Sequence, residues 1–74
     1  KASTCLCPTD STWGVDMSEN CVINTACSLG ASGALTFANT GNFYVNATIT
    51  TDAMGDPGNG ATVWMRSVGI ISIT

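Results

Sequence analysis

Residues 42–51 constrain the fold of this chain more than any other stretch, because two kinds of side chain alternate along them. Every second position is apolar, namely Phe43, Val45, Ala47 and Ile49. The positions between them carry Tyr44, Asn46, Thr48 and Thr50. A period of two places one set on each face of an extended strand, whereas a helix repeats about every 3.6 residues. The stretch therefore predicts a half-buried β-strand with Phe43, Val45 and Ile49 in the core.

Other short segments have the same strand-like character. They are residues 3–7, 21–26, 34–38, 61–68 and 70–74. Glycine, asparagine and proline separate them, and the turn signal at residues 39–42 predicts a β-hairpin over residues 34–51. Residues 52–60 predict a glycine-rich loop, and no segment has the pattern of a capped amphipathic helix. We expect a single all-β domain over residues 1–74, a small sandwich-like fold of about five or six strands.

Four cysteines lie in the first third of the chain: Cys5, Cys7, Cys21 and Cys27. A 74-residue chain buries too small a core to be more than marginally stable, and an even cysteine count is typical of disulfides formed in an oxidising compartment. Three pairings are open. We favour Cys5–Cys27 nested around Cys7–Cys21, because cysteines two apart on one strand rarely bond each other. Four thiolates binding zinc are the alternative, but the C-x-C and C-x5-C spacings and the absence of histidine favour disulfides.

Charged residues make up 9% of the chain, against roughly 25% in ordinary soluble domains. Such a neutral surface favours burial against other subunits or a coat of glycan. A net charge of −3 with Lys1 and Arg66 as the only basic residues argues against nucleic acid, which requires a basic surface. No apolar run of about 20 residues predicts a membrane span. Because no leader is visible at Lys1, we expect the mature form of an extracellular protein.

The sequence offers little for catalysis, so we expect no enzyme. Histidine is absent, and a cysteine nucleophile would lack its usual partner. The carboxylates all lie in predicted loops, at Asp10, Asp16, Glu19, Asp52 and Asp56. Asp52, Asp56 and Asn59 could supply oxygen ligands to calcium, but Asp-Pro-Gly and Asn-Gly are ordinary turn sequences. We therefore predict no metal and no cofactor.

Asn46-Ala47-Thr48 matches the acceptor sequence for N-glycosylation. Asn46 is on the polar face of the predicted strand, where a glycan would project into solvent. We predict a glycan at Asn46, which would supply the hydration that the surface charge does not.

The C-terminal run contains Ile70, Ile71 and Ile73, and no Lys, Glu or Pro interrupts it. Natural proteins protect exposed strand edges with such residues, since an unprotected edge pairs with other chains. The run is either a central strand of the domain's own sheet or a strand shared between subunits, as in donor-strand complementation. In the second interpretation, Ile70, Ile71 and Ile73 form the subunit interface.

Residues 33–50, preceded by the segment 21–27, are rich in Thr and Asn within β-type sequence. In this they resemble segments of archaeal secreted surface proteins. Over residues 21–74, composition and strand style are similar to the small, charge-poor, disulfide-bearing β subunits of archaeal extracellular filaments, such as threads and bundling pili. The chain is shorter than typical members and lacks the helical N-terminus of type IV pilins. The resemblance implies a filament that polymerises by strand exchange and carries glycan outside.

The leading functional hypothesis is therefore a structural subunit that assembles with copies of itself into an extracellular filament or surface layer. The alternative is a monomeric secreted module that binds carbohydrate or protein through Trp13, Tyr44 and Trp64. For Trp13 we favour a different position, packed beside the cystines as a lid on a small core.

Overall fold

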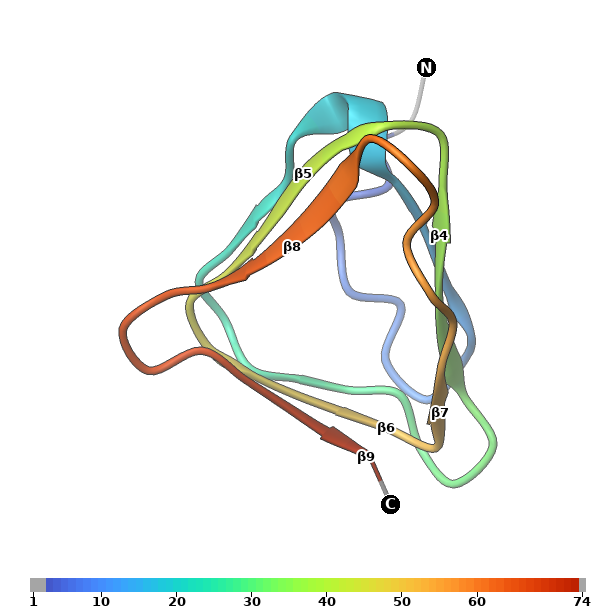
Figure 1. The fold of residues 1–74 in the computed structure, drawn as a ribbon. Helices are drawn as coiled ribbons and strands as arrows, with labels where there is room; N and C mark the ends of the chain where they lie inside the picture. The colour runs from blue at the N-terminus through green and yellow to red at the C-terminus, as the bar shows by residue number, and fades with distance from the viewer. Residues whose placement is uncertain (1–2, 74) are drawn as a thin grey trace.

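The computed structural model describes residues 3–73, and these wind into a triangular β-solenoid of three coils (Figure 1). The first coil contains β1 (Trp13–Asp16), the short 3-10 helix η1 (Met17–Glu19), β2 (Val22–Ile23) and β3 (Cys27–Ser28). The second contains β4 (Ala34–Ala38), β5 (Gly41–Val45) and β6 (Thr48–Thr51). The third contains β7 (Ala53–Met54), β8 (Ala61–Met65) and β9 (Ile70–Ile73). The predicted all-β class with N-terminal disulfides is thus confirmed.

Each side of the triangle is a three-stranded parallel sheet, in the orders β1-β4-β7, β2-β5-β8 and β3-β6-β9. Trp13 pairs with Leu35, 22 residues later in the chain. The same step relates Cys27 to Ile49. The predicted sandwich of five or six strands is therefore wrong in its arrangement. The predicted hairpin over residues 34–51 is also wrong, because β4 and β5 lie in different sheets.

The corner between β5 and β6 explains how one alternating stretch forms two strands. The chain turns at Asn46 and Ala47 without losing its alternation, so Val45 and Ile49 both point inward and are buried. A hairpin and a solenoid corner both follow an alternating strand with turn-forming residues, and local sequence does not separate them. Left-handed backbone conformations at corners are adopted by Asn20, Gly30, Asn39, Gly60 and Ser67.

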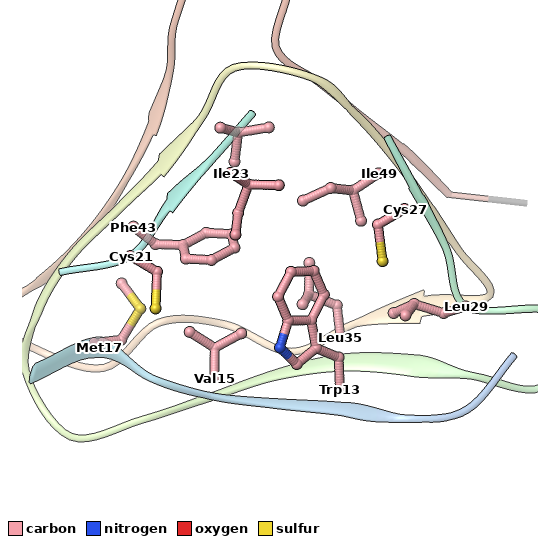
Figure 2. Close-up of a cluster of buried hydrophobic side chains, with 11 residues drawn as sticks. Trp13, Val15, Met17, Cys21, Ile23, Cys27, Leu29, Leu35, Phe43 and Ile49 are labelled. Atoms are coloured by element: carbon pink, nitrogen blue, oxygen red, sulfur yellow. The ribbon is translucent and has the colours of Figure 1, made fainter. Parts of the chain in front are cut away.

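The core fills the inside of the triangle (Figure 2). The predicted core residues Phe43, Val45 and Ile49 are all fully buried, which confirms that prediction. Trp13 is 2% exposed and meets the Phe43 ring edge to face, with ring centroids 5.8 Å apart. The preferred position of Trp13, a buried lid, is also confirmed.

Two disulfides are present, but their pairing differs from the nested prediction. The bonds are Cys5–Cys21 and Cys7–Cys27. The expected strand over residues 3–7 does not form; instead this segment crosses the end of the first coil (Figure 1). Cys5 therefore bonds Cys21, which follows η1, and Cys7 bonds Cys27 in β3. Along this segment the cysteines come in the same order as their partners along the first coil.

Candidate functional site

The two ends of the solenoid differ. At the first coil, the inward-facing residues Trp13, Val15 and Ile23 are buried. The segment 3–10 crosses this end of the solenoid (Figure 1). At the third coil, Met65 is 52% and Ile73 is 58% exposed. These two residues pair in register with Val45 and Thr51, which are fully buried one coil earlier. The last layer of the core therefore faces outward.

This exposed layer forms the candidate site, which we call the open end. Its inward-facing side chains are Met54, Val63, Met65, Ile71 and Ile73, each in register with a buried residue of the second coil. None of the five carries charge. Met54, Val63 and Ile71 are partly buried against the core, while Met65 and Ile73 are exposed. Exposed apolar side chains that gather at one end of a molecule are typical of interaction surfaces.

The backbone of the open end has unused hydrogen-bonding capacity along β8. The Arg66 amide donates to the Val45 carbonyl at 2.8 Å, and the Gly60 carbonyl accepts from the Gly41 amide at 3.2 Å. Because N–H and C=O groups alternate sides along a strand, the residues between these anchors alternate too. Val63 and Met65 therefore direct their backbone groups away from β5, toward an edge that no described strand occupies. The Ala61 carbonyl faces the same edge, while the Ala61 amide donates to the Gly58 carbonyl at 3.1 Å.

The same alternation applies to β9. The Ile70 amide donates to the Ala47 carbonyl at 3.2 Å, so the backbone groups of Ile71 and Ile73 face the open edge. All three residues of the predicted interface thus lie on an edge strand. Ile71 and Ile73 belong to the end layer, whereas Ile70 is in register with the exposed Thr48 on the outer surface. The strand is at the edge of its sheet, so the central-strand interpretation is wrong for the described chain.

Residues 3–10, which we call the cap, close the opposite end. Besides the two disulfides, the Thr4 carbonyl accepts from Trp13 Nε1 at 2.7 Å. The Thr4 hydroxyl accepts from the Asp16 amide at 2.8 Å, and the Asp10 amide donates to the Ser28 carbonyl at 3.0 Å. The cap therefore occupies edge groups of β1 and β3 that another strand would need.

Glu19 anchors the cap from η1. Its carboxylate accepts from the Thr4 hydroxyl at 2.7 Å, the Thr4 amide at 3.1 Å and the Ser3 hydroxyl at 2.9 Å. Hydrogen bonds to the ionised form, with those from Thr4 the strongest, lower the pKa of Glu19 from its ordinary value of 4.5.

The outer surface of the sheet β2-β5-β8 carries aligned aromatic and amide side chains. Tyr44 and Trp64 stack with centroids 6.4 Å apart and planes 16° apart, and the Arg66 guanidinium lies 5.6 Å from the Tyr44 ring centroid. Asn42 donates through Nδ2 to Asn20 Oδ1 at 3.2 Å and accepts from Trp64 Nε1 at 2.9 Å. These contacts link the three coils along the solenoid axis.

Of the proposed aromatic contact residues, only two share a surface. Tyr44 and Trp64 stack on this outer face, while Trp13 is buried in the core and is unavailable to a ligand. Trp64 remains 49% exposed. A hollow of about 220 Å³ beside Tyr44 is lined by Val22, Asn46, Arg66 and Ser67 as well.

Asn46 lies at the corner after β5 and is half-buried. Its Nδ2 donates to Asn24 Oδ1 at 3.0 Å on the surface. An asparagine amide has two hydrogens, so one can bond Asn24 while the other position is substituted.

Among residues 3–73, the remaining polar candidates do not bring together a set of free metal ligands. Cys5, Cys21 and Glu19 lie close together, but both sulfurs are joined in a disulfide and offer no thiolate. Asp56 and Asn59 are exposed in the connection between β7 and β8, and the exposed Asp52 precedes β7. A hollow of about 360 Å³ lies at the capped end, beside Leu6 and Trp13.

Met54, Val63 and Met65 are site residues that the sequence reasoning did not identify. The predicted strand within residues 61–68 contains Val63 and Met65, but nothing in the sequence indicates that they face the end of a core. The step between paired residues is 22 from Trp13 to Leu35, but it is 19 from Leu35 to Met54 and 20 from Phe43 to Val63. No fixed repeat length therefore finds these three residues.

No protein-family model, curated protein or solved structure matches this chain. Within residues 3–73, no helix has the length and apolar character that a membrane span requires. The two disulfides are consistent with an oxidising, extracellular environment.

Proposed function

We propose that this protein is a non-catalytic structural subunit of an extracellular assembly, and that it joins copies of itself through the open end by β-strand pairing. One observation supports this most directly: one end of the solenoid is closed by a disulfide-anchored cap, while the other exposes its last core layer and strand edges. Association there would bury apolar side chains and satisfy backbone groups at once.

The low charge of the surface supports the same role. Charged residues make up 9% of the chain, and the inward side chains of the open end are uncharged. Copies therefore meet there without like-charge repulsion. A filament or surface layer is the assembly that the sequence pattern favours, with a glycan on Asn46 projecting from the side rather than from the end.

The alternative, a monomeric module that binds carbohydrate, has one specific observation in its favour. Trp64 exposes part of an aromatic ring on the outer sheet face, and such rings bind sugars by stacking. Tyr44 is less suited, because Trp64 stacks on its ring and Arg66 lies over it. Self-association therefore uses more of the observed surface.

Light scattering on the unreduced protein over a range of concentrations tests the proposal. We expect the mass to rise above 7.6 kDa per particle as concentration increases. Ile73→Lys places a charge on the open end and should weaken association at least about tenfold, because burying an Ile contributes about 1.5–3 kcal/mol.

Leu6→Lys is the matched control, since Leu6 is an exposed apolar residue at the capped end. It should leave association unchanged. Circular dichroism checks that both variants remain folded. A wild-type protein that stays monomeric at every concentration would exclude self-assembly and favour the binding module.

A further inference from the structure

We infer that two copies join tail to tail about a two-fold axis, with β8 of one copy paired antiparallel to β8 of the other. This inference rests on the proposed function and adds which surfaces meet and in what order. Each open end would then be covered by the open end of a second copy.

The cap determines that like ends meet. A head-to-tail contact would pair the open end with the edges of β1, β2 and β3. The cap already binds two of these edges, through the Asp16 amide and the Ser28 carbonyl, and two disulfides anchor it there. The cap leaves the edge of β2 unbound, but β2 has two residues only, so the third coil offers the longest unpaired edge in the described part of the chain. The same surface of each copy is therefore the one that joins. A contact in which one surface meets itself is a closed two-fold contact.

The shape of a solenoid end determines which strands meet. The end is a ramp that climbs by one strand spacing, about 4.8 Å, over one coil. It starts at β7, passes β8 and finishes at β9, with a step at the corner between β9 and β7 (Figure 1). The end ramps of two copies lie parallel to each other, without a gap, when the two-fold axis is perpendicular to the solenoid axis and passes through the step. This two-fold axis then crosses the middle of the side opposite the step, which is β8.

Two consequences follow for the strands. β8 lies against β8 of the other copy, and β9 lies against β7 of the other copy. A two-fold axis perpendicular to a strand reverses its direction, so the β8 pair is antiparallel.

The backbone of β8 is suited to this pairing. The Ala61 carbonyl and the N–H and C=O groups of Val63 and Met65 face the open edge, whereas the Ala61 amide donates to the Gly58 carbonyl at 3.1 Å. Centring the pair on Val63 puts the Ala61 carbonyl opposite the Met65 amide of the other copy. The end-layer side chains then stay inside the joined core, and Thr62 lies opposite Trp64 on the outer face.

Cross-linking of Thr62→Cys tests the geometry. Thr62 is exposed on the outer face, and its counterpart in the other copy is a diagonal neighbour at about 7–8 Å, within reach of a short bismaleimide. Val22→Cys is the matched control, because Val22 is exposed on the first strand of the same sheet at the capped end. We expect covalent dimers from Thr62→Cys and only background from Val22→Cys.

The outcomes separate this inference from the proposed function. Particles that stop at two copies, with cross-linking of Thr62→Cys alone, support the inference and self-association through the open end, and they exclude a filament or surface layer built through that end alone. An open series of oligomers, or linking of Thr62→Cys to Val22→Cys in a mixture, means head-to-tail stacking and overturns only the inference. Dimers that leave Thr62→Cys unlinked also overturn only the inference. Monomers at all concentrations overturn both.

Hydrogen exchange of the unmodified protein provides a second measurement that needs no variant. In the two-fold pair the Val63 amide is hydrogen-bonded, so its exchange should slow at least about tenfold as concentration rises. A Val63 amide that exchanges at one rate while the particle mass doubles would overturn the inference.

Discussion

At the scale of single residues, Thr51 shows how the solenoid admits a polar side chain into its core. The residue is fully buried in line with the inward-facing Ile49. Its hydroxyl lies 2.9 Å from the Gly33 carbonyl and 2.8 Å from the Ala53 carbonyl, at the corner where the second coil passes into the third. A buried hydroxyl is stable only with such partners, so Thr51 ties two turns of backbone together.

Thr51→Val should therefore destabilise the fold. The methyl group replaces the hydroxyl at similar volume and leaves the carbonyls without this donor, at a cost of about 1–2 kcal/mol. Thr50→Val, at the outward-facing neighbour, is the control and should change stability by less than about 0.5 kcal/mol. Denaturant unfolding with the disulfides intact measures both. Equal effects would mean that the Thr51 hydroxyl is not structurally important.

Gly33 is a second residue at which close packing of the backbone favours one amino acid, glycine. A Cβ at this position would collide with the Leu29 carbonyl oxygen, which is backbone and cannot move aside. Gly33 is buried at the corner before β4, where adjacent segments approach closely.

Gly33→Ala should cost about 1–3 kcal/mol of unfolding free energy, because the backbone must shift to relieve the overlap. Gly58→Ala is the matched control, since nothing lies within 4 Å of a Cβ there. Its effect should stay within about 0.5 kcal/mol. Thermal unfolding compares the two, and an undiminished Tm for Gly33→Ala would contradict the tight packing at this corner.

At the scale of elements, the cap is held by two disulfides and by hydrogen bonds to an ionisable side chain. The disulfides fix Cys5 and Cys7 to the first coil, and Glu19 binds Ser3 and Thr4 between them and the N-terminus. The cap can therefore loosen locally when Glu19 is protonated while the disulfides hold it in place.

The pH dependence has a defined sign. The pKa of Glu19 in the folded protein lies below its ordinary value of 4.5, so its contribution to stability is present above that value. This contribution is lost as the pH falls through the lowered pKa of the folded state. Glu19→Gln should be less stable than the wild type near about pH 6 and equally stable once both forms are uncharged.

Unfolding curves at several pH values check this, with Glu19→Asp as a variant that keeps the charge but shortens its reach. A stability difference between wild type and Glu19→Gln that does not change from neutral to strongly acidic pH would show that Glu19 acts through its shape alone.

At the scale of the whole molecule, the difference between the two ends of the solenoid links the stability of the fold to self-association. Among the described strands, those of the second coil pair on both sides and those of the third coil pair on one side. In the proposed assembly the end layer that the monomer exposes would become core, so association would add to the free energy of unfolding.

The Tm of the wild-type protein should therefore rise with protein concentration, as mass action requires for an associating native state. Ile73→Lys should unfold at a Tm that is nearly independent of concentration over the same range. Calorimetry of the unreduced proteins measures both. A wild-type Tm that stays constant over a hundredfold range would contradict stabilisation by association.

Local sequence patterns alone predict the all-β class, the burial of Phe43, Val45 and Ile49, and the use of the cysteines in disulfides. They also locate β4 at residues 34–38 and the last strand at Ile70–Ile73. These features depend on local sequence. Alternation indicates which side chains are buried, and an even cysteine count in a small domain indicates disulfide bonds.

Only the tertiary structure decided which segments are neighbours. Strand alternation is the same in an antiparallel hairpin and in a parallel coil, so it carries no information about the partner strand. The path of residues 3–7 across the first coil decided the bonds Cys5–Cys21 and Cys7–Cys27. The end layer with Val63 and Met65 likewise exists only because coils stack along one axis, which leaves the last layer of an otherwise buried core in contact with solvent.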